Sequence, residues 1–128
     1  MILADSSAWI EFLRGTGSRT ARQLETHIRG EEVVVTDPVL MEVLAGARDD
    51  HEWVELSRML GRFEFARVEN GDWLDAARLR RTMAGAGRTL RNAIDCLIAV
   101  VAIRTGSAVL SADADFAAIA ELAPLRIA

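Results

Sequence analysis

Five short apolar segments, separated by longer stretches with helical character, restrict the fold of this chain more than any other feature. They occupy residues 1–4, 33–36, 63–67, 108–111 and 125–127. Such segments are too short and too apolar to keep one face in water, so we expect a mostly parallel sheet that helices cover on both faces. The chain of 128 residues shows no repeat, linker or low-complexity stretch, which predicts a single domain over residues 1–128.

Capping signals predict where several of the helices begin. Ser6 or Ser7 is a suitable N-cap for the first helix. Asp37-Pro38 predicts a helix with the aspartate as N-cap and the proline at the first helical position. The most apolar helix is expected over residues 92–105, and a final helix over residues 113–122.

The basic residues exclude several classes of enzyme. All 15 of them are arginine, and the chain has no lysine. This excludes a P-loop nucleotide hydrolase, whose lysine holds the phosphates, and Schiff-base catalysis. Two histidines are too few for a multi-histidine zinc site, and the single cysteine, Cys96, excludes an internal disulfide. The formal net charge of −4 argues weakly against a nucleic-acid partner.

Membrane insertion and export are not expected. The longest unbroken apolar run covers residues 96–103, whereas a membrane-spanning helix needs about 20 residues. The N-terminal residues have no basic region and include Asp5 and Glu11, unlike a cleaved signal peptide. We therefore expect a cytoplasmic protein with no membrane partner.

Four of the 19 acidic residues have apolar neighbours. Most of the others, such as Asp72 and Asp75, fall on polar helix faces where water solvates them. An ionised carboxylate without a partner in an apolar setting costs several kcal/mol, so the four exceptions need an explanation. They are Asp5, Glu42, Asp95 and Asp113.

Each of the four also has an ordinary structural explanation. Asp5 and Asp113 follow strands and are suited to cap the helix that comes next. An arginine partner would explain Glu42. Asp95 lies near a helix start, where a negative charge is favourable. However, a structural explanation for all four acids together is less convincing than one for any single acid.

The predicted topology lets the four carboxylates meet in one cleft. Ligands of open α/β sheets bind at the carboxyl ends of the strands, where Asp5 and Asp113 lie. Glu42 and Asp95 fall in early helical turns near strand ends. Carboxylates this close raise one another's pKa, and a divalent cation such as Mg²⁺ or Mn²⁺ removes the repulsion. The pattern therefore predicts a carboxylate metal site.

Four segments occur in an order and spacing that match a known family. They are Asp5-Ser-Ser-Ala-Trp9, Glu42 in the helix opened by Asp37-Pro38, Asp95-Cys-Leu-Ile-Ala99, and Ser111-Ala-Asp113-Ala-Asp115-Phe116. With these segments, essentially the whole chain resembles the PIN-domain ribonucleases, and most closely the VapC-type toxins of bacterial type II toxin–antitoxin (VapBC) pairs.

The resemblance implies a three-layer α/β/α PIN-like domain with a short, mostly parallel sheet of four to five strands. It also implies an Mg²⁺- or Mn²⁺-dependent endoribonuclease that hydrolyses RNA phosphodiester bonds with one ion or two. Asp115 would be a further metal ligand, and Ser7 matches a position whose hydroxyl supports the first aspartate. The catalytic metal ligands implied by the resemblance are Asp5, Glu42, Asp95 and Asp113.

The same resemblance implies three kinds of partner. The substrate would be a transfer, ribosomal or messenger RNA. A small VapB-like antitoxin would cover the acidic cleft with its C-terminal segment, and the chain would form a homodimer. Its high apolar content also predicts helix faces that meet a partner, with Trp9, Trp53 and Trp73 in the core or in an interface.

A cluster of arginines precedes the Asp95 segment. Without the four candidate acids, the other 15 acidic residues balance the 15 arginines. Residues 76–94 hold five arginines and no acidic residue, and we expect Arg88 and Arg91 to contact RNA phosphates, with Arg14 as a third candidate. The alternative is that arginines here, above all Arg78 and Arg81, pair with acids on the helix surface.

Three other classes of protein share some of these features. A non-catalytic PIN-like module that binds RNA or a partner is the main alternative, and the intact set of acids argues against it. A phosphoacceptor signalling domain uses a lysine to hold the phosphate. A phosphohydrolase with an aspartate nucleophile needs Asp-x-Asp after the first strand, where this chain has Ser7. The absence of lysine argues against both of these classes.

Overall fold

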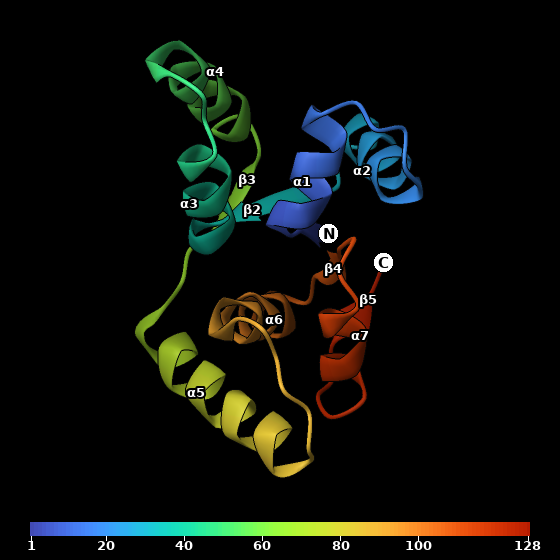
Figure 1. Cartoon of the computed structure of the whole chain (residues 1–128), viewed down its shortest axis with the longest axis vertical. Coiled ribbons are helices and arrows are strands. Elements are labelled where there is room, and N and C mark those ends of the chain that lie inside the picture. Colours follow the sequence, from blue (N-terminus) through green and yellow to red (C-terminus); the bar gives the residue numbers. More distant parts are fainter.

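The computed structural model describes all 128 residues and contains one fully parallel, five-stranded sheet (Figure 1). The strand order is β3-β2-β1-β4-β5, so β1 lies at the centre. Each predicted apolar segment forms one strand, which confirms the expected α/β fold. The strands are β1 (Ile2–Ala4), β2 (Val33–Thr36), β3 (Glu64–Ala66), β4 (Ala108–Leu110) and β5 (Arg126–Ile127).

Seven helices connect the strands and cover both faces of the sheet. Parallel strands are joined by right-handed crossovers, which place the helices before β3 on one face and those after β3 on the other. Figure 1 shows this division, with the first four helices above the sheet and the last three below it. They are α1 (Ser6–Leu13), α2 (Arg19–Arg29), α3 (Asp37–Ala45), α4 (Asp50–Leu60), α5 (Asn70–Gly85), α6 (Ala93–Thr105) and α7 (Asp115–Ala120).

One hydrophobic core joins the two layers of helices through the sheet. Trp9 of α1 and Phe116 of α7 are its largest fully buried side chains. Helix α6 is buried over residues 96–102, including Cys96, because it packs against α5, α7 and α3. A helix enclosed on all sides is apolar on all sides. This enclosure fixes the N-terminal end of α6, where Asp95 lies.

The structure corrects the predicted caps of two helices. Asp5, not Ser6 or Ser7, caps α1, because its Oδ1 accepts a hydrogen bond from the Ala8 amide at 3.0 Å. Asp37 is the first residue of α3, and the N-cap position belongs to Thr36.

The carboxylate of Asp37 has a different partner from the one predicted. It accepts a hydrogen bond from the Val68 amide at 2.8 Å and pairs with Arg67. A contact across 31 residues has therefore replaced the local cap.

The last helix and one surface assignment also differ from expectation. Helix α7 begins at Asp115 rather than Asp113, because residues 111–114 form a loop that is hydrogen-bonded to Asp5 and Ser7. Asp72 is not solvated but 2% exposed, and its carboxylate binds Arg104. Trp9 lies in the core as expected, whereas Trp53 and Trp73 are exposed. Of the two places predicted for these two side chains, the core is excluded, and an interface with a partner stays a prediction.

None of the helices combines the length and the apolar character that crossing a bilayer requires.

Candidate metal centre

The site forms where β1 and β4 end side by side. Ala4 pairs with Leu110 in the sheet, and the Asp5 amide donates to the Leu110 carbonyl at 3.0 Å. Residues that directly follow either strand therefore meet at the carboxyl edge of the sheet, although more than 100 positions separate them in the sequence. This is the edge at which the sequence predicted a site.

Asp5 is held at this edge by three hydrogen bonds. Besides the Ala8 amide, Ser7 Oγ donates to Oδ1 at 2.7 Å and Ser111 Oγ donates to Oδ2 at 2.7 Å. Asp5 is 4% exposed, and this burial raises its pKa. The hydrogen bonds oppose the shift, while the Asp113 carboxylate adds to it, and the net result is a pKa above the ordinary value.

Ser7 and Ser111 also tie the loop after β4 to the end of β1. Ser7 Oγ accepts from the Ala112 amide at 3.0 Å, and Ser111 Oγ accepts from the Asp113 amide at 2.9 Å. The two hydroxyls thus orient the first aspartate and shape the loop that carries Asp113.

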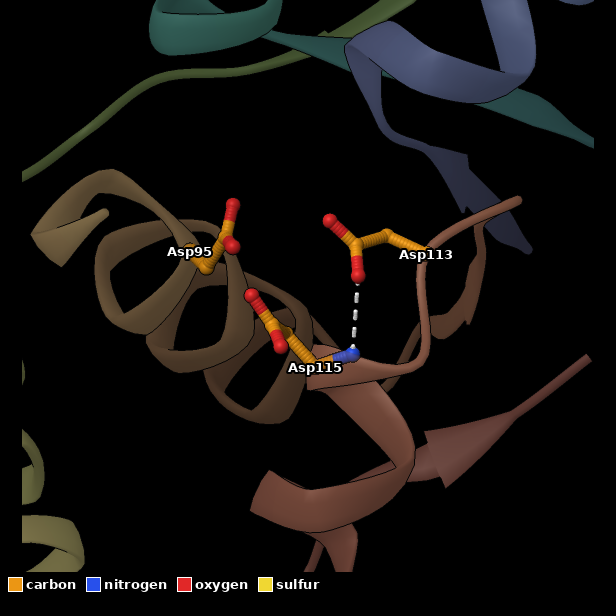
Figure 2. Close-up of side chains that lie close together, drawn as sticks. All are labelled: Asp95, Asp113 and Asp115. Carbon is orange, nitrogen blue, oxygen red and sulfur yellow. Dashed lines mark hydrogen bonds between the residues drawn. The ribbon is translucent and has the colours of Figure 1, made fainter. Parts of the chain in front are cut away.

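Asp95, Asp113 and Asp115 point toward one another, as Figure 2 shows, with one oxygen of each within 4.8 Å of the others. Asp95 comes from the first turn of α6, Asp113 from the loop after β4, and Asp115 from the start of α7. Asp113 Oδ1 accepts a hydrogen bond from the Asp115 amide at 3.1 Å, drawn as the dashed line in Figure 2. Three separate elements therefore direct carboxylates to one point.

Burial and nearby carboxylates both disfavour the ionised form of Asp95. Its burial, followed by the nearby carboxylates of four other acids, raises the pKa of Asp95 to about 7. The four are Asp5, Asp113, Asp115 and Glu42. The full ionisation of this cluster is therefore unfavourable when no counter-charge is present.

Glu42 and Asp5 border the cluster of three. Glu42 lies on α3, where burial raises its pKa, a hydrogen bond with Ser6 lowers it, and the Asp5 carboxylate raises it again. Of the predicted metal ligands, the structure thus gathers Asp95, Asp113 and Asp115 most closely. Asp5 and Glu42 interact with that group electrostatically from its edge.

The donor atoms fit a hard divalent cation. All of them are carboxylate oxygens, which Mg²⁺ and Mn²⁺ prefer, and there is no thiolate or imidazole among them. Asp115 Oδ2 is buried and has no hydrogen-bond partner, so it keeps a lone pair free for a ligand.

The three candidate RNA-binding arginines lie in different places. Arg91 Nη2 donates to Asp113 Oδ2 at 2.9 Å, so this side chain reaches the cluster itself. Arg88 pairs with Glu121. Arg14 lines a groove of about 680 Å³ between α1, α3 and α4, to which Glu42 also contributes. The alternative prediction, that arginines of residues 76–94 pair with acids on the helix surface, is confirmed for Arg78, which forms an ion pair with Asp75.

Comparison with known proteins identifies the family. The model of the PIN domain matches residues 2–122 of the chain. This chain belongs to the PIN-domain family. Over its full length it is 38% identical to VapC ribonuclease Mb1587 of Mycobacterium bovis and to Ribonuclease VapC11 of Mycobacterium tuberculosis, and it covers 98% of each. The predicted relationship to VapC-type proteins is thereby confirmed.

The fold of this PIN domain also occurs in a solved structure. One chain of the crystal structure of VapBC2 from Rickettsia felis, bound to a DNA fragment from its promoter, aligns with a TM-score of 0.77. The alignment covers 100% of this chain and 98% of that one at 18% identity. The expected three-layer PIN-like architecture is confirmed.

Two residues of this PIN domain were not assigned a role from the sequence. Ser111 holds Asp5 Oδ2, and the Ser6 hydroxyl lies near Glu42, where it lowers the pKa of that carboxyl. The available signal for Ser111 was its position directly after a strand, two residues before Asp113. The hydroxyl at Ser6 had no such signal, because it meets Glu42 only once α1 and α3 are packed together.

Proposed function

We propose that this PIN domain is a metal-dependent endoribonuclease toxin that hydrolyses RNA phosphodiester bonds at the carboxylate cluster. The full-length identity to VapC ribonucleases supports the ribonuclease class. The observation that carries the metal-dependent chemistry is the convergence of three carboxylates within 4.8 Å. A protein seldom keeps such a group without a counter-charge, because each ionised carboxylate raises the pKa of the others.

The chain's own residues have distinct parts in this proposal. The cation ligands are Asp95, Asp113 and Asp115. The carboxylates of Asp5 and Glu42 add negative charge beside the cation, and Ser7 positions Asp5. A bound Mg²⁺ or Mn²⁺ stabilises the charge that develops on the phosphate and activates water as a nucleophile. Arg91 lies next to the cluster, where its guanidinium is close enough to bind an RNA phosphate.

We further propose that the substrate is a transfer, ribosomal or messenger RNA and that the toxin acts in the cytoplasm, where these RNAs occur. A VapB-like antitoxin neutralises it by covering the acidic cleft. The VapBC structure of the same fold supports an antitoxin of this kind. A homodimer is supported by large apolar side chains left exposed on the surface, among them Trp53, Trp73 and Leu74.

A cleavage assay on purified, antitoxin-free chain tests this proposal. The substrates are structured RNAs, including tRNAs, with Mg²⁺, with Mn²⁺ or with EDTA. We expect cleavage with either metal, none with EDTA, and a loss of about 100-fold or more in Asp5→Asn and Asp95→Asn. The matched control Asp75→Asn, on the exposed face of α5, should cleave like the wild type.

Two results would contradict the proposal. Cleavage that persists in EDTA, or that both active-site variants retain, would mean that the cluster is not the catalytic metal centre. Calorimetry covers the case in which no RNA is cleaved. If neither Asp5→Asn nor Asp95→Asn weakens Mn²⁺ binding, the chain is a non-catalytic module that binds RNA or a partner.

A further inference from the structure

Arg91 is the only cation in contact with the carboxylate cluster. Its Nη2 lies 2.9 Å from Asp113 Oδ2, and its Nε lies 3.9 Å from Asp115 Oδ2. The second distance is too long for a hydrogen bond. Asp115 Oδ2 is therefore paired in charge with the guanidinium while its lone pair remains free.

The backbone that carries Arg91 is fixed on both sides. Leu90, directly before it, is 3% exposed and belongs to the hydrophobic core, which holds this segment in place. Asn92, directly after it, caps α6 by accepting a hydrogen bond from the Ile94 amide at 2.9 Å. The position of the residue is thus set by neighbours that do not involve the cluster.

The side chain of Arg91 is not fixed in the same way. It is 79% exposed, and the two aspartates of the cluster are its only ion-pair partners. An exposed ion pair is weak, and a long arginine side chain can exchange partners without moving its backbone. A divalent cation at the same two carboxylates carries twice the charge of the guanidinium and is a hard ion that prefers oxygen ligands.

We propose that Arg91 is a tethered counter-ion that competes with the divalent cation for Asp113 and Asp115 and, once displaced, binds a phosphate of the RNA. This inference rests on the proposed function, because it concerns the same metal centre. In the metal-free chain the guanidinium offsets part of the repulsion among the carboxylates. When the cation neutralises Asp113 and Asp115, the guanidinium of Arg91 loses its partners. It then lies beside the place where the RNA backbone binds, and arginine binds phosphate groups well.

The first test measures Mn²⁺ binding by calorimetry, without RNA, in wild type, Arg91→Gln, Arg91→Lys and Arg29→Gln. Arg29→Gln is the matched control, because it removes the same charge from an exposed ion pair on α2. Removal of a competitor should make Arg91→Gln bind Mn²⁺ about two- to fivefold more tightly than wild type. Arg91→Lys keeps the charge and should bind like wild type, as should Arg29→Gln.

The second test measures binding of an RNA oligonucleotide in chains that all carry Asp5→Asn, so that the RNA stays intact, with Mn²⁺ at a concentration that calorimetry shows to saturate each of them. Adding Arg91→Gln should weaken RNA binding and lower the slope of log affinity against log salt by about one. Adding Arg29→Gln should change neither quantity.

The outcomes separate this inference from the proposed function. Unchanged or weaker Mn²⁺ binding in Arg91→Gln would overturn the competition, and unchanged RNA binding would overturn the transfer to phosphate. Either result leaves the metal centre intact, provided that Asp95→Asn loses Mn²⁺ binding in the same titration. If the wild type itself binds no Mn²⁺, the metal centre is wrong and the role of Arg91 falls with it.

Discussion

Two serine hydroxyls give Asp5 a defined orientation that its own backbone would not impose. Both carboxylate oxygens are occupied, Oδ1 by Ser7 and the Ala8 amide and Oδ2 by Ser111. Groups that orient a metal-binding carboxylate typically change metal affinity or activity by about 10–100-fold when they are removed. In Asp5, the side chain that caps α1 is thus also one that we propose for the active site.

Ser111→Ala is expected to lower Mn²⁺ affinity and RNA cleavage by about 10–100-fold, because Asp5 Oδ2 loses its hydrogen-bond donor and the loop that carries Asp113 loses an anchor. Calorimetry and single-turnover cleavage measure the two effects. The control is Ser107→Ala, which removes a buried hydroxyl at the other end of β4 and should affect stability alone. Equal metal affinity in wild type and Ser111→Ala would show that this hydroxyl does not support the site.

The sequence predicts which acidic residues gather at the site better than it predicts which residues pair with them. Asp95 and Asp113 could be selected because an acid with apolar neighbours is unusual. The sequence also suggested Asp115, and the structure brings it as close to the others as Asp95. The pairing of Arg91 with Asp113 spans 22 residues and depends on how the loop before α6 packs, which no local pattern encodes.

Among the elements, α5 and α6 belong to the layer that presents Asp95, and an ion pair between a buried aspartate and a partly exposed arginine joins them. Asp72 near the start of α5 is 2% exposed and accepts three hydrogen bonds from Arg104 near the end of α6, at 2.9 to 3.2 Å. These bonds are the main reason why the pKa of Asp72 lies below its ordinary value. Arg104 also binds the Arg67 carbonyl, so the same guanidinium holds the segment after β3.

Asp72→Asn is expected to lower the free energy of unfolding by about 2–3 kcal/mol at pH 7, because Arg104 loses its buried charge partner and keeps only the exposed Glu69, 3.4 Å away. A carboxylate with a lowered pKa stabilises the fold above its unfolded pKa of about 3.9, and this contribution disappears as the pH falls below that value. Urea unfolding should therefore show a larger difference between variant and wild type at pH 7 than at pH 3, because the contribution is lost as the pH falls toward the lowered pKa of the folded state.

The control for this change is Asp75→Asn, which breaks the exposed pair with Arg78 on the same helix. It should cost about 0–1 kcal/mol. A similar cost for both variants at pH 7 would mean that burial of Asp72 adds nothing to its pairing with Arg104.

The sequence predicts elements well and their ends less well. The β2 segment and the apolar helix α6 were found with their expected bounds to within one residue, because burial on all sides leaves an unbroken apolar run. Asp37 was expected to cap α3, but a tertiary partner at Val68 outweighed the local signal. The start of α7 moved to Asp115 because residues 112 and 113 are hydrogen-bonded to Ser7 and Ser111 instead.

Across the molecule, the proposed metal centre draws on both helical layers and on the sheet between them. Glu42 comes from α3 on one face, Asp95 and Asp115 come from the other face, and Asp5 follows the central strand. A cation that binds such a site stabilises the complete fold rather than one element, because it binds only the folded chain.

Mn²⁺ is expected to raise the melting temperature of the wild type by about 10 °C at pH 8, at an ion concentration of 100 times its Kd. The shift should fall to roughly half at pH 6. With its pKa raised to about 7, Asp95 is mostly protonated at that pH, and the ion must displace the proton. Differential scanning calorimetry measures both shifts.

Asp95→Asn should show little stabilisation by Mn²⁺ at either pH, since it lacks the carboxylate that the ion needs. A shift in wild type that does not depend on pH would contradict the assignment of Asp95 as the ligand that exchanges a proton for metal.

The pairing of Asp5 with Ser111 has a consequence for synthesis of the protein on the ribosome. The two residues are separated by 106 positions, so the first aspartate is made long before the partner that fixes it. At about 5–20 residues per second, that interval lasts roughly 5–20 s. During this time the nascent chain has no strand β4 and no acidic cluster. A transcript truncated before the Asp115 codon yields a product without the complete carboxylate cluster, so the activity that we propose for this cluster cannot appear until that codon has been translated.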